Sequence, residues 1–304
     1  MGKNVMTTAI CTTAPRTIGN RTLRVFMSFL VLFMTAVLFT GCKKGQSEWK
    51  KAVASMKEEE YEEAVKQFKE SAGKGNTDAR MMLALCYMTG MGVDQDVKKA
   101  EKQLRNAVKS GDPVAQAAYG MFLRIQLEQG REYDEEDLEE AIKYLKKSAD
   151  QDCVFGQLAL GMTYLFSGNE DSEKGIKLLK KVAARPKTGK KIFLDDVKAC
   201  VWDYLVETQF SDISDKEEAE MIRAVSKALE SDELTVLDIV TIMSQSVLFT
   251  YYAEEEKDYD EAEKWLNKAK KSGLPQKIHT MAKEELDNKR SRSTRYRNYD
   301  DYDW

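Results

Sequence analysis

Apolar residues recur along most of the chain at the spacing of amphipathic helices. In three segments an alanine is followed by an apolar residue four positions on and by a small residue three positions after that. The three copies are Ala64, Phe68, Ser71; Ala100, Leu104, Ala107; and Ala141, Leu145, Ser148. Their intervals of 36 and 41 residues fit one helix pair per copy. One pair is too small to bury its own apolar face, so we expect the pairs to stack on their neighbours.

A second helix pattern also occurs three times. It lies before the copy at Ala100, before the copy at Ala141, and again after the copy at Ala141. It places a small residue, an apolar residue, a second small residue and an apolar or aromatic residue at constant spacing. The copies are Ala79, Leu83, Ala84, Tyr87; Ala115, Tyr119, Gly120, Leu123; and Gly156, Leu160, Gly161, Tyr164. Small side chains at these positions let two helices approach closely, so this helix is predicted to be the first of each pair.

The connection between the two helices carries its own motif. Gly90, Met91, Gly92, Val93 and Asp94 precede Lys99, Ala100 and the rest of the second helix up to Gly111. The whole unit resembles the Sel-like repeat, a close relative of the tetratricopeptide repeat. The resemblance extends from Asn76 to about Arg185 and implies an all-α fold, a right-handed superhelical solenoid of about six antiparallel helix pairs. It also implies that the two glycines form the turn between helices and do not bind phosphate, since no strand precedes them.

The rest of the body is expected to extend this array. Repeats are predicted over 47–185, with a starting helix pair before Gly75, and degenerate repeats and a capping helix over 186–289. The cap helix, Pro275 to Lys289, contains His279, which is expected at the surface. Residues 290–304 show no helical period and are expected to be a disordered tail. Exposed Tyr and Trp there leave open the alternative of a recognition segment.

The amino-terminal segment differs from the body. Residues 1–41 hold four basic residues and no acidic one, followed by an apolar run from Val25 to Phe39, as in a secretory signal. Leu38 to Cys42 resembles a bacterial lipobox, although that family usually has Leu where this chain has Phe39. The resemblance implies lipid attachment at Cys42, with 42–46 as the anchor linker. An uncleaved or ordinarily cleaved signal with Cys42 incidental is the alternative.

Lipid attachment would place the protein in a bacterial cell envelope, with its body in the periplasm or exterior. An aspartate directly after the lipidated cysteine is associated with retention in the inner membrane. This chain has Lys43 at that position, so the outer membrane is weakly favoured. Two or more acyl chains suffice for stable anchoring.

Charge and residue counts narrow the function. The chain has 47 basic and 51 acidic residues, and removal of the amino-terminal segment would leave 43 basic ones. The resulting net charge of −8 disfavours nucleic acid as a partner. The single histidine and the lack of paired cysteines predict no metal site and no cofactor, and we expect no enzymatic activity. Cys86, Cys153 and Cys200 are expected to be small buried side chains.

The predicted binding surface is the concave face, which first helices line in tetratricopeptide-like arrays. The candidate partner-binding residues form a Met-rich row between the packing positions: Met81, Leu85, Met88, Met121, Arg124 and Met162. Flexible thioethers would accept an amphipathic helix or apolar peptide. The alternative is that these residues pack between repeats.

The sequence therefore predicts a membrane-anchored scaffold that binds a protein or peptide partner and no small-molecule substrate. A lipoprotein component of outer-membrane protein assembly is the second hypothesis. An enzyme is the third, although the hydrolases assigned to this repeat family carry paired cysteines in each repeat, and Cys86 and Cys153 stand alone in theirs.

Overall fold

The structure is a computed structural model that describes residues 45–58, 60–128, 135–166, 171–185, 236–274 and 276–300. These residues are all-α, with eleven α-helices and one short 3-10 turn. They fall into two compact units, and α10 contributes to both, since the boundary falls after Leu178. The predicted signal segment and Cys42 lie outside the described residues. Within the described part of the chain, no helix has the length and hydrophobicity to cross a membrane.

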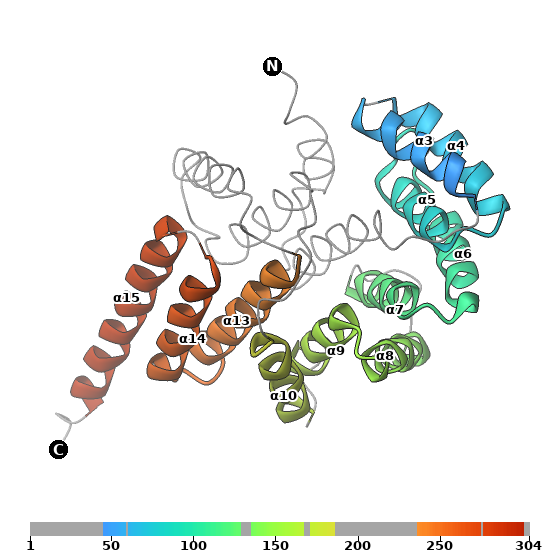
Figure 1. Cartoon of the computed structure of the whole chain (residues 1–304). Coiled ribbons are helices and arrows are strands. Elements are labelled where there is room, and N and C mark those ends of the chain that lie inside the picture. The colour runs from blue at the N-terminus through green and yellow to red at the C-terminus, as the bar shows by residue number, and fades with distance from the viewer. Residues whose placement is uncertain are drawn as a thin grey trace. The chain divides into compact units, whose positions relative to one another are not determined.

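The helices of the first unit follow one another in antiparallel pairs (Figure 1). They are α3 (Gln46–Lys57), α4 (Tyr61–Gly73), α5 (Thr77–Thr89), α6 (Val97–Ala107), α7 (Pro113–Glu128), α8 (Glu135–Asp150), α9 (Val154–Phe166) and α10 (Ser172–Ala183), and the 3-10 turn Val108–Ser110 follows α6. The predicted starting pair is α3 and α4. The second unit holds the C-terminal part of α10, followed by α13 (Val236–Glu254), α14 (Tyr259–Ser272) and α15 (Gln276–Asp300).

First and second helices differ in how they are buried. The middle turns of α5, α7 and α9 are buried on every side, whereas α4, α6 and α8 bury one stripe and expose the rest. The first helices also contact one another, α5 with α7 and α7 with α9. A helix that is apolar all round needs neighbours on all sides, and an amphipathic helix needs only one. The sequence thus sets an inner layer of first helices and an outer layer of second helices.

Small residues permit the close approach that the sequence predicted. A Cβ atom built on Gly120 would lie 2.7 Å from Leu145 Cγ and 2.9 Å from the Ala141 carbonyl oxygen. On Gly175 it would lie 2.7 Å from the carbonyl oxygen of Gly161. The backbones of paired helices are therefore nearly in contact at these points, which explains why larger residues are absent there.

Three of the second helices, α4, α8 and α14, end in the same corner. The carbonyls of Ser71, Ser148 and Ala269 accept hydrogen bonds from the amide five residues later, with N···O distances of 3.2, 3.3 and 2.9 Å. The fourth residue after the closing small residue has positive φ in four repeats: Gly75 (89°), Gly111 (76°), Asp152 (58°) and Gly273 (119°). This left-handed residue ends a helix in the manner of a Schellman motif.

The glycine loop is the interhelix turn that the sequence predicted. Gly90 ends α5 with φ of 77° and donates its amide to the Cys86 carbonyl at 2.8 Å. Gly92 also has positive φ, 66°, and lies against the backbone of Tyr61 and Glu62 on α4. The loop therefore connects its own helix pair and also contacts the preceding one.

Two of the three predicted buried cysteines lie in described residues. Cys86 is 1% exposed, and burial raises the pKa of its thiol to about 12, as expected for an inert apolar side chain. Cys153 is only half-buried. Cys200 lies outside the described residues.

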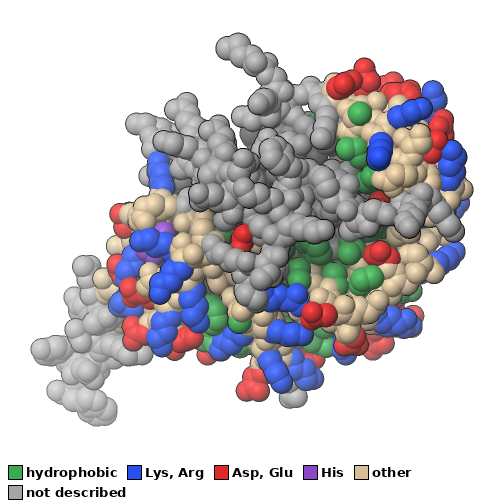
Figure 2. All heavy atoms as spheres, in the orientation of Figure 1, with side chains coloured by type: hydrophobic (Ala, Val, Ile, Leu, Met, Phe, Trp, Pro, Cys, Tyr) green, Lys and Arg blue, Asp and Glu red, His purple; other side chains and the backbone are tan. Residues whose placement is uncertain are grey.

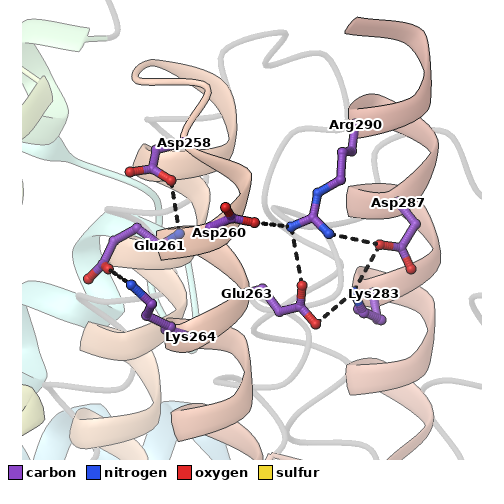
Figure 3. A network of polar contacts seen from close by, with 8 residues as sticks. All are labelled: Asp258, Asp260, Glu261, Glu263, Lys264, Lys283, Asp287 and Arg290. Carbon is purple, nitrogen blue, oxygen red and sulfur yellow. Dashed lines mark hydrogen bonds and ion pairs between the residues drawn. The ribbon is translucent and has the colours of Figure 1, made fainter. Parts of the chain in front are cut away.

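The capping helix α15 continues to Asp300, well past Lys289, where the sequence analysis expected the helical period to end. Its apolar side, Ile278, Ala282 and Leu286, is buried. Beyond Leu286 ion pairs replace apolar contacts (Figure 3): Arg290 binds Asp260 at 2.9 Å and Glu263 at 3.2 Å. These carboxylates belong to α14, so residues distant in the sequence hold α15 against α14 at this point.

Lys283 is the second bridge between α14 and α15 (Figure 3). Its Nζ lies 2.7 Å from Glu263 and 2.9 Å from Asp287. Burial opposes its charge, but the hydrogen bonds to the two carboxylates outweigh this and raise the pKa of Lys283.

His279 was expected at the surface, and this expectation was wrong. The side chain is 8% exposed, and its Nε2 lies 3.0 Å from Asn267 Oδ1 on α14. Burial, together with the charges of Lys270 and Lys283, lowers the pKa of His279 despite the opposing effect of Glu263. The helical spacing of Ile278, Ala282 and Leu286 leaves the neighbouring position 279 at the edge of the same buried side.

The lowered pKa of His279 predicts that mild acid destabilises the second unit. The unfolded chain binds a proton near pH 6.5 and the folded chain binds it only at lower pH, so this contribution to stability is present above pH 6.5 and is lost as the pH falls. We expect the thermal midpoint to be lower at pH 5.5 than at pH 7.5. In His279→Gln the difference between the two pH values should shrink, because the chain has no other histidine. If the difference in thermal midpoint between pH 5.5 and pH 7.5 stayed the same in His279→Gln, His279 would not be the cause of the acid destabilisation.

Candidate functional site

The six predicted partner-binding residues lie on the inner helices α5, α7 and α9. Leu85, Met121 and Met162 occupy equivalent positions of the three helices. All six side chains are buried: exposure is 0% for Met81, Met121 and Met162, 2% for Leu85, 6% for Met88 and 8% for Arg124.

This burial limits what the Met-rich row can contact. A buried side chain reaches a partner only when the residues that cover it move. In this structure α5 packs on α7, and α7 packs on α9. Buried positions on these helices are suited to such contacts between first helices. The burial agrees with the alternative that the sequence left open, in which the row packs between repeats.

The sequence analysis missed a polar cluster that joins three helices. Arg105 on α6 stacks on the ring of Tyr119 on α7, with its guanidinium carbon 5.1 Å from the ring centroid. The same guanidinium binds Glu140 on α8 through two nitrogens, at 3.2 and 3.4 Å. Tyr119 donates its hydroxyl to Glu140 at 3.1 Å, and burial raises its pKa. The cluster therefore links one repeat to the next.

The Tyr119 hydroxyl is expected to contribute measurably to stability. Tyr119→Phe keeps the stacked ring and removes a hydrogen bond to a carboxylate, so we expect a loss of about 1–2 kcal/mol in the free energy of unfolding. Tyr144→Phe is the matched control, because the Tyr144 ring packs edge-on against Tyr119 at 5.1 Å and its hydroxyl makes no hydrogen bond among the described residues. The control should cost less than about 0.5 kcal/mol in a urea titration. Equal losses would refute the role of the hydroxyl.

The second unit contains a comparable cluster of rings and lysines. Lys180 Nζ lies 3.2 Å from the Tyr252 hydroxyl and 6.0 Å from the ring centroid of Trp265. Lys268 lies 3.7 Å from the centroid of the same ring. Trp265 is 5% exposed, and these two cations lie over its ring, where a cation–π contact stabilises it as part of the core.

The exposed surface is strongly charged. In the space-filling view, lysine, arginine and acidic side chains are scattered over the described surface with both signs side by side, among hydrophobic and other side chains (Figure 2). Across the described ranges no group of three or more His, Cys, Asp or Glu side chains is placed to hold a metal ion.

Comparison with known proteins matches the repeats one by one. A family model described as Sel1 repeat matches residues 77–112, 113–153, 154–185 and 251–274. Four segments of the chain are thus similar to the Sel1 repeat. The first three matches confirm the resemblance predicted from Asn76 to Arg185, and the fourth covers the end of α13 and all of α14. The matched segments thus occur in both units.

Solved structures with the same repeat are only distantly similar. A Sel1 repeat protein from Oxalobacter formigenes is 20% identical, with a TM-score of 0.36, over 69% of this chain and 79% of that one. The antigen c5321 of uropathogenic Escherichia coli, which displays the same repeat fold, is 21% identical, with a TM-score of 0.35, over 75% of this chain and 53% of that one. The chain thus spans about half the length of c5321. No curated protein matches.

Proposed function

We propose that the protein is a lipid-anchored scaffold that binds a protein partner through its Sel1 repeats. The observation that carries this proposal is the stack of in-register helix pairs from α3 to α10. Repeats of this kind present an extended surface that grows with each copy, and helical repeat arrays use such surfaces to bind other proteins.

Accessible positions on the inner layer lie at the ends of its helices. Arg80 and Thr89 on α5 and Leu127 on α7 are half-exposed, whereas the turns between them are buried. A partner that approaches the inner layer would meet these residues first. The buried Met-rich row would then hold the repeats in register beneath the contact surface.

Site-specific crosslinking in cells tests the scaffold. A photo-crosslinking residue at Thr89 or Leu127 should give a discrete adduct, identified by mass spectrometry, whereas one at the exposed position Lys98 of α6, on the outer layer, should give none. One recurrent partner would support the scaffold, and many nascent envelope proteins would favour a role in outer-membrane protein assembly. Adducts of equal pattern from all three positions would argue against a defined surface.

The anchor is supported by the lipobox-like segment that ends at Cys42 and by the short linker to α3, which begins at Gln46. Metabolic labelling with a palmitate analogue should mark the wild-type protein and leave Cys42→Ala unlabelled. Cys153→Ala is the control, because Cys153 is half-buried and far from the segment in sequence. Unchanged labelling of Cys42→Ala would reject lipid attachment at this residue.

A further inference from the structure

Two cations of the second unit lie over one aromatic ring and have no carboxylate as a partner. Lys180 Nζ, on α10, lies 6.0 Å from the centroid of the Trp265 ring, and Lys268 Nζ, on α14, lies 3.7 Å from it. Both lysine side chains are exposed. Neither forms an ion pair within the described part of the chain. Two like charges therefore converge on one ring and repel each other.

Acidic residues are absent from the two segments that carry these lysines. No Asp or Glu occurs in residues 174–185 or in residues 264–283. Other lysines of the second unit bind carboxylates that lie next to them (Figure 3): Lys264 binds Glu261, and Lys283 binds Glu263. An anionic group bound beside the Trp265 ring would relieve the repulsion between Lys180 and Lys268 in the same way.

Hydrogen-bond donors accompany this charge. Lys180 Nζ donates to the Tyr252 hydroxyl at 3.2 Å, so this hydroxyl keeps its own hydrogen to donate. The indole N–H of Trp265 is buried and has no acceptor among the described residues. We call Lys180, Tyr252, Trp265 and Lys268 the lysine–aromatic cluster. Its donors and charge favour a ligand that offers carboxylates, and its lysine stems offer apolar surface to aromatic rings.

One segment of this chain has the composition that the cluster favours. Residues 299–304 read Tyr, Asp, Asp, Tyr, Asp, Trp, with three carboxylates, three aromatic rings and no cation. Asp300 is the last residue of α15, and residues 301–304 lie outside the described residues. We call 299–304 the acidic segment. Its aspartates complement the two ammonium groups, and its rings complement the lysine stems.

The acidic segment cannot reach the cluster of its own chain while α15 stays helical. His279 contacts Asn267, so α15 passes Lys268 close to its own residue 279. Asp300 follows His279 by 21 residues, which corresponds to about 32 Å along the helix. Asp303 lies three residues further on and adds a reach of at most about 11 Å. A second copy of the chain can supply the acidic segment without this restriction.

We infer that the acidic segment of one copy binds the lysine–aromatic cluster of a second copy. The cluster and the segment are different surfaces of the same chain, so the contact is head to tail and leaves each copy with a site for a further one. The contact uses α10, α13 and α14 and none of the inner helices α5, α7 and α9. It therefore goes beyond the proposed binding of a partner to the inner layer.

Fluorescence anisotropy tests this contact with a labelled peptide of residues 298–304 and the full-length protein in neutral detergent micelles. We expect the peptide to bind, with affinity falling as salt increases. The variant Lys180→Glu, Lys268→Glu should lose at least tenfold in affinity. A peptide with Asp301→Lys and Asp303→Lys should bind this variant and not the wild type. Such a restoration would not follow if the two lysines only stabilised the fold.

A matched double variant controls for net charge. Lys257→Glu, Lys271→Glu changes two other exposed lysines of the second unit and should bind the native peptide within threefold of the wild type. Circular dichroism should be unchanged in both double variants. In light scattering, the mass of the wild-type protein should rise with concentration, and that of the full-length variant Asp301→Lys, Asp303→Lys should not.

Four results would each overturn the inference. They are no binding of the native peptide, equal losses in the two lysine variants, no binding of the reversed peptide to Lys180→Glu, Lys268→Glu, and a wild-type mass that is independent of concentration. Binding of the cluster to phosphatidylglycerol vesicles without any binding of the peptide would also overturn it and would assign the cluster to a membrane. None of these results affects crosslinking at Thr89 and Leu127, so the two proposals fail separately.

Discussion

Met121→Glu is expected to unfold the first unit, whether or not a partner is present. Met121 is 0% exposed in the inner layer, between α5 and α9. A carboxylate there either stays charged in an apolar site or takes up a proton to become neutral, and both outcomes disfavour the folded state. We expect a loss of about 4 kcal/mol or more in the free energy of unfolding. Met162→Glu, at the equivalent position of α9, should behave alike.

Met121→Leu is the control, since a swap of similar volume usually costs less than about 1.5 kcal/mol. Urea titrations followed by circular dichroism measure both variants. If Met121→Glu kept its helical signal and lost only partner crosslinking, the Met-rich row would be a binding groove and the packing interpretation would fail. The experiment therefore decides between the two alternatives that the sequence left open.

Gly92→Ala is expected to show the second-largest loss of stability. Its φ of 66° disfavours any residue with a Cβ, at about 1–2 kcal/mol. A Cβ here would also overlap the Tyr61 carbonyl and lie 2.8 Å from the Glu62 amide nitrogen. Because both neighbours are backbone, they cannot turn aside as a side chain would. The strain and the overlap together should cost about 2–5 kcal/mol.

Gly111→Ala separates the two causes. Gly111 has a similar φ of 76°, but a Cβ there would meet nothing within 4 Å. It should cost only the conformational part, about 1–2 kcal/mol, in the same titration. If Gly92→Ala lost no more stability than Gly111→Ala, the contact between the loop and α4 would not contribute measurably to stability.

Much of the fold could be predicted because its signals are local. The motif from Ala141 to Ser148 repeats the spacing of earlier copies, and this spacing alone identifies a second helix and its buried stripe. The close approach at Gly120 and the turn at Gly90 also follow from single residue types whose geometry is restricted.

Other features depend on neighbours that are distant in sequence. Whether Met81 or Arg124 is exposed depends on the packing of the next repeat, which a helical period does not report. His279 is buried and contacts Asn267 on α14, and Arg290 of α15 binds carboxylates of α14, so both depend on residues that are distant in the sequence. The hydrogen bond between Tyr119 and Glu140 could not be predicted, because the sequence shows only an aromatic and an acidic residue in adjacent helices.

The left-handed residue that follows four of the second helices makes the repeat an exchangeable module. Removal of residues 76–111 would join Gly75 to Asp112, and both Gly75 and Gly111 hold the left-handed conformation that turns the chain into the next first helix. The new junction would inherit a backbone path already suited to it. Gain or loss of one unit could thus lengthen or shorten such a protein in whole steps without a new linker.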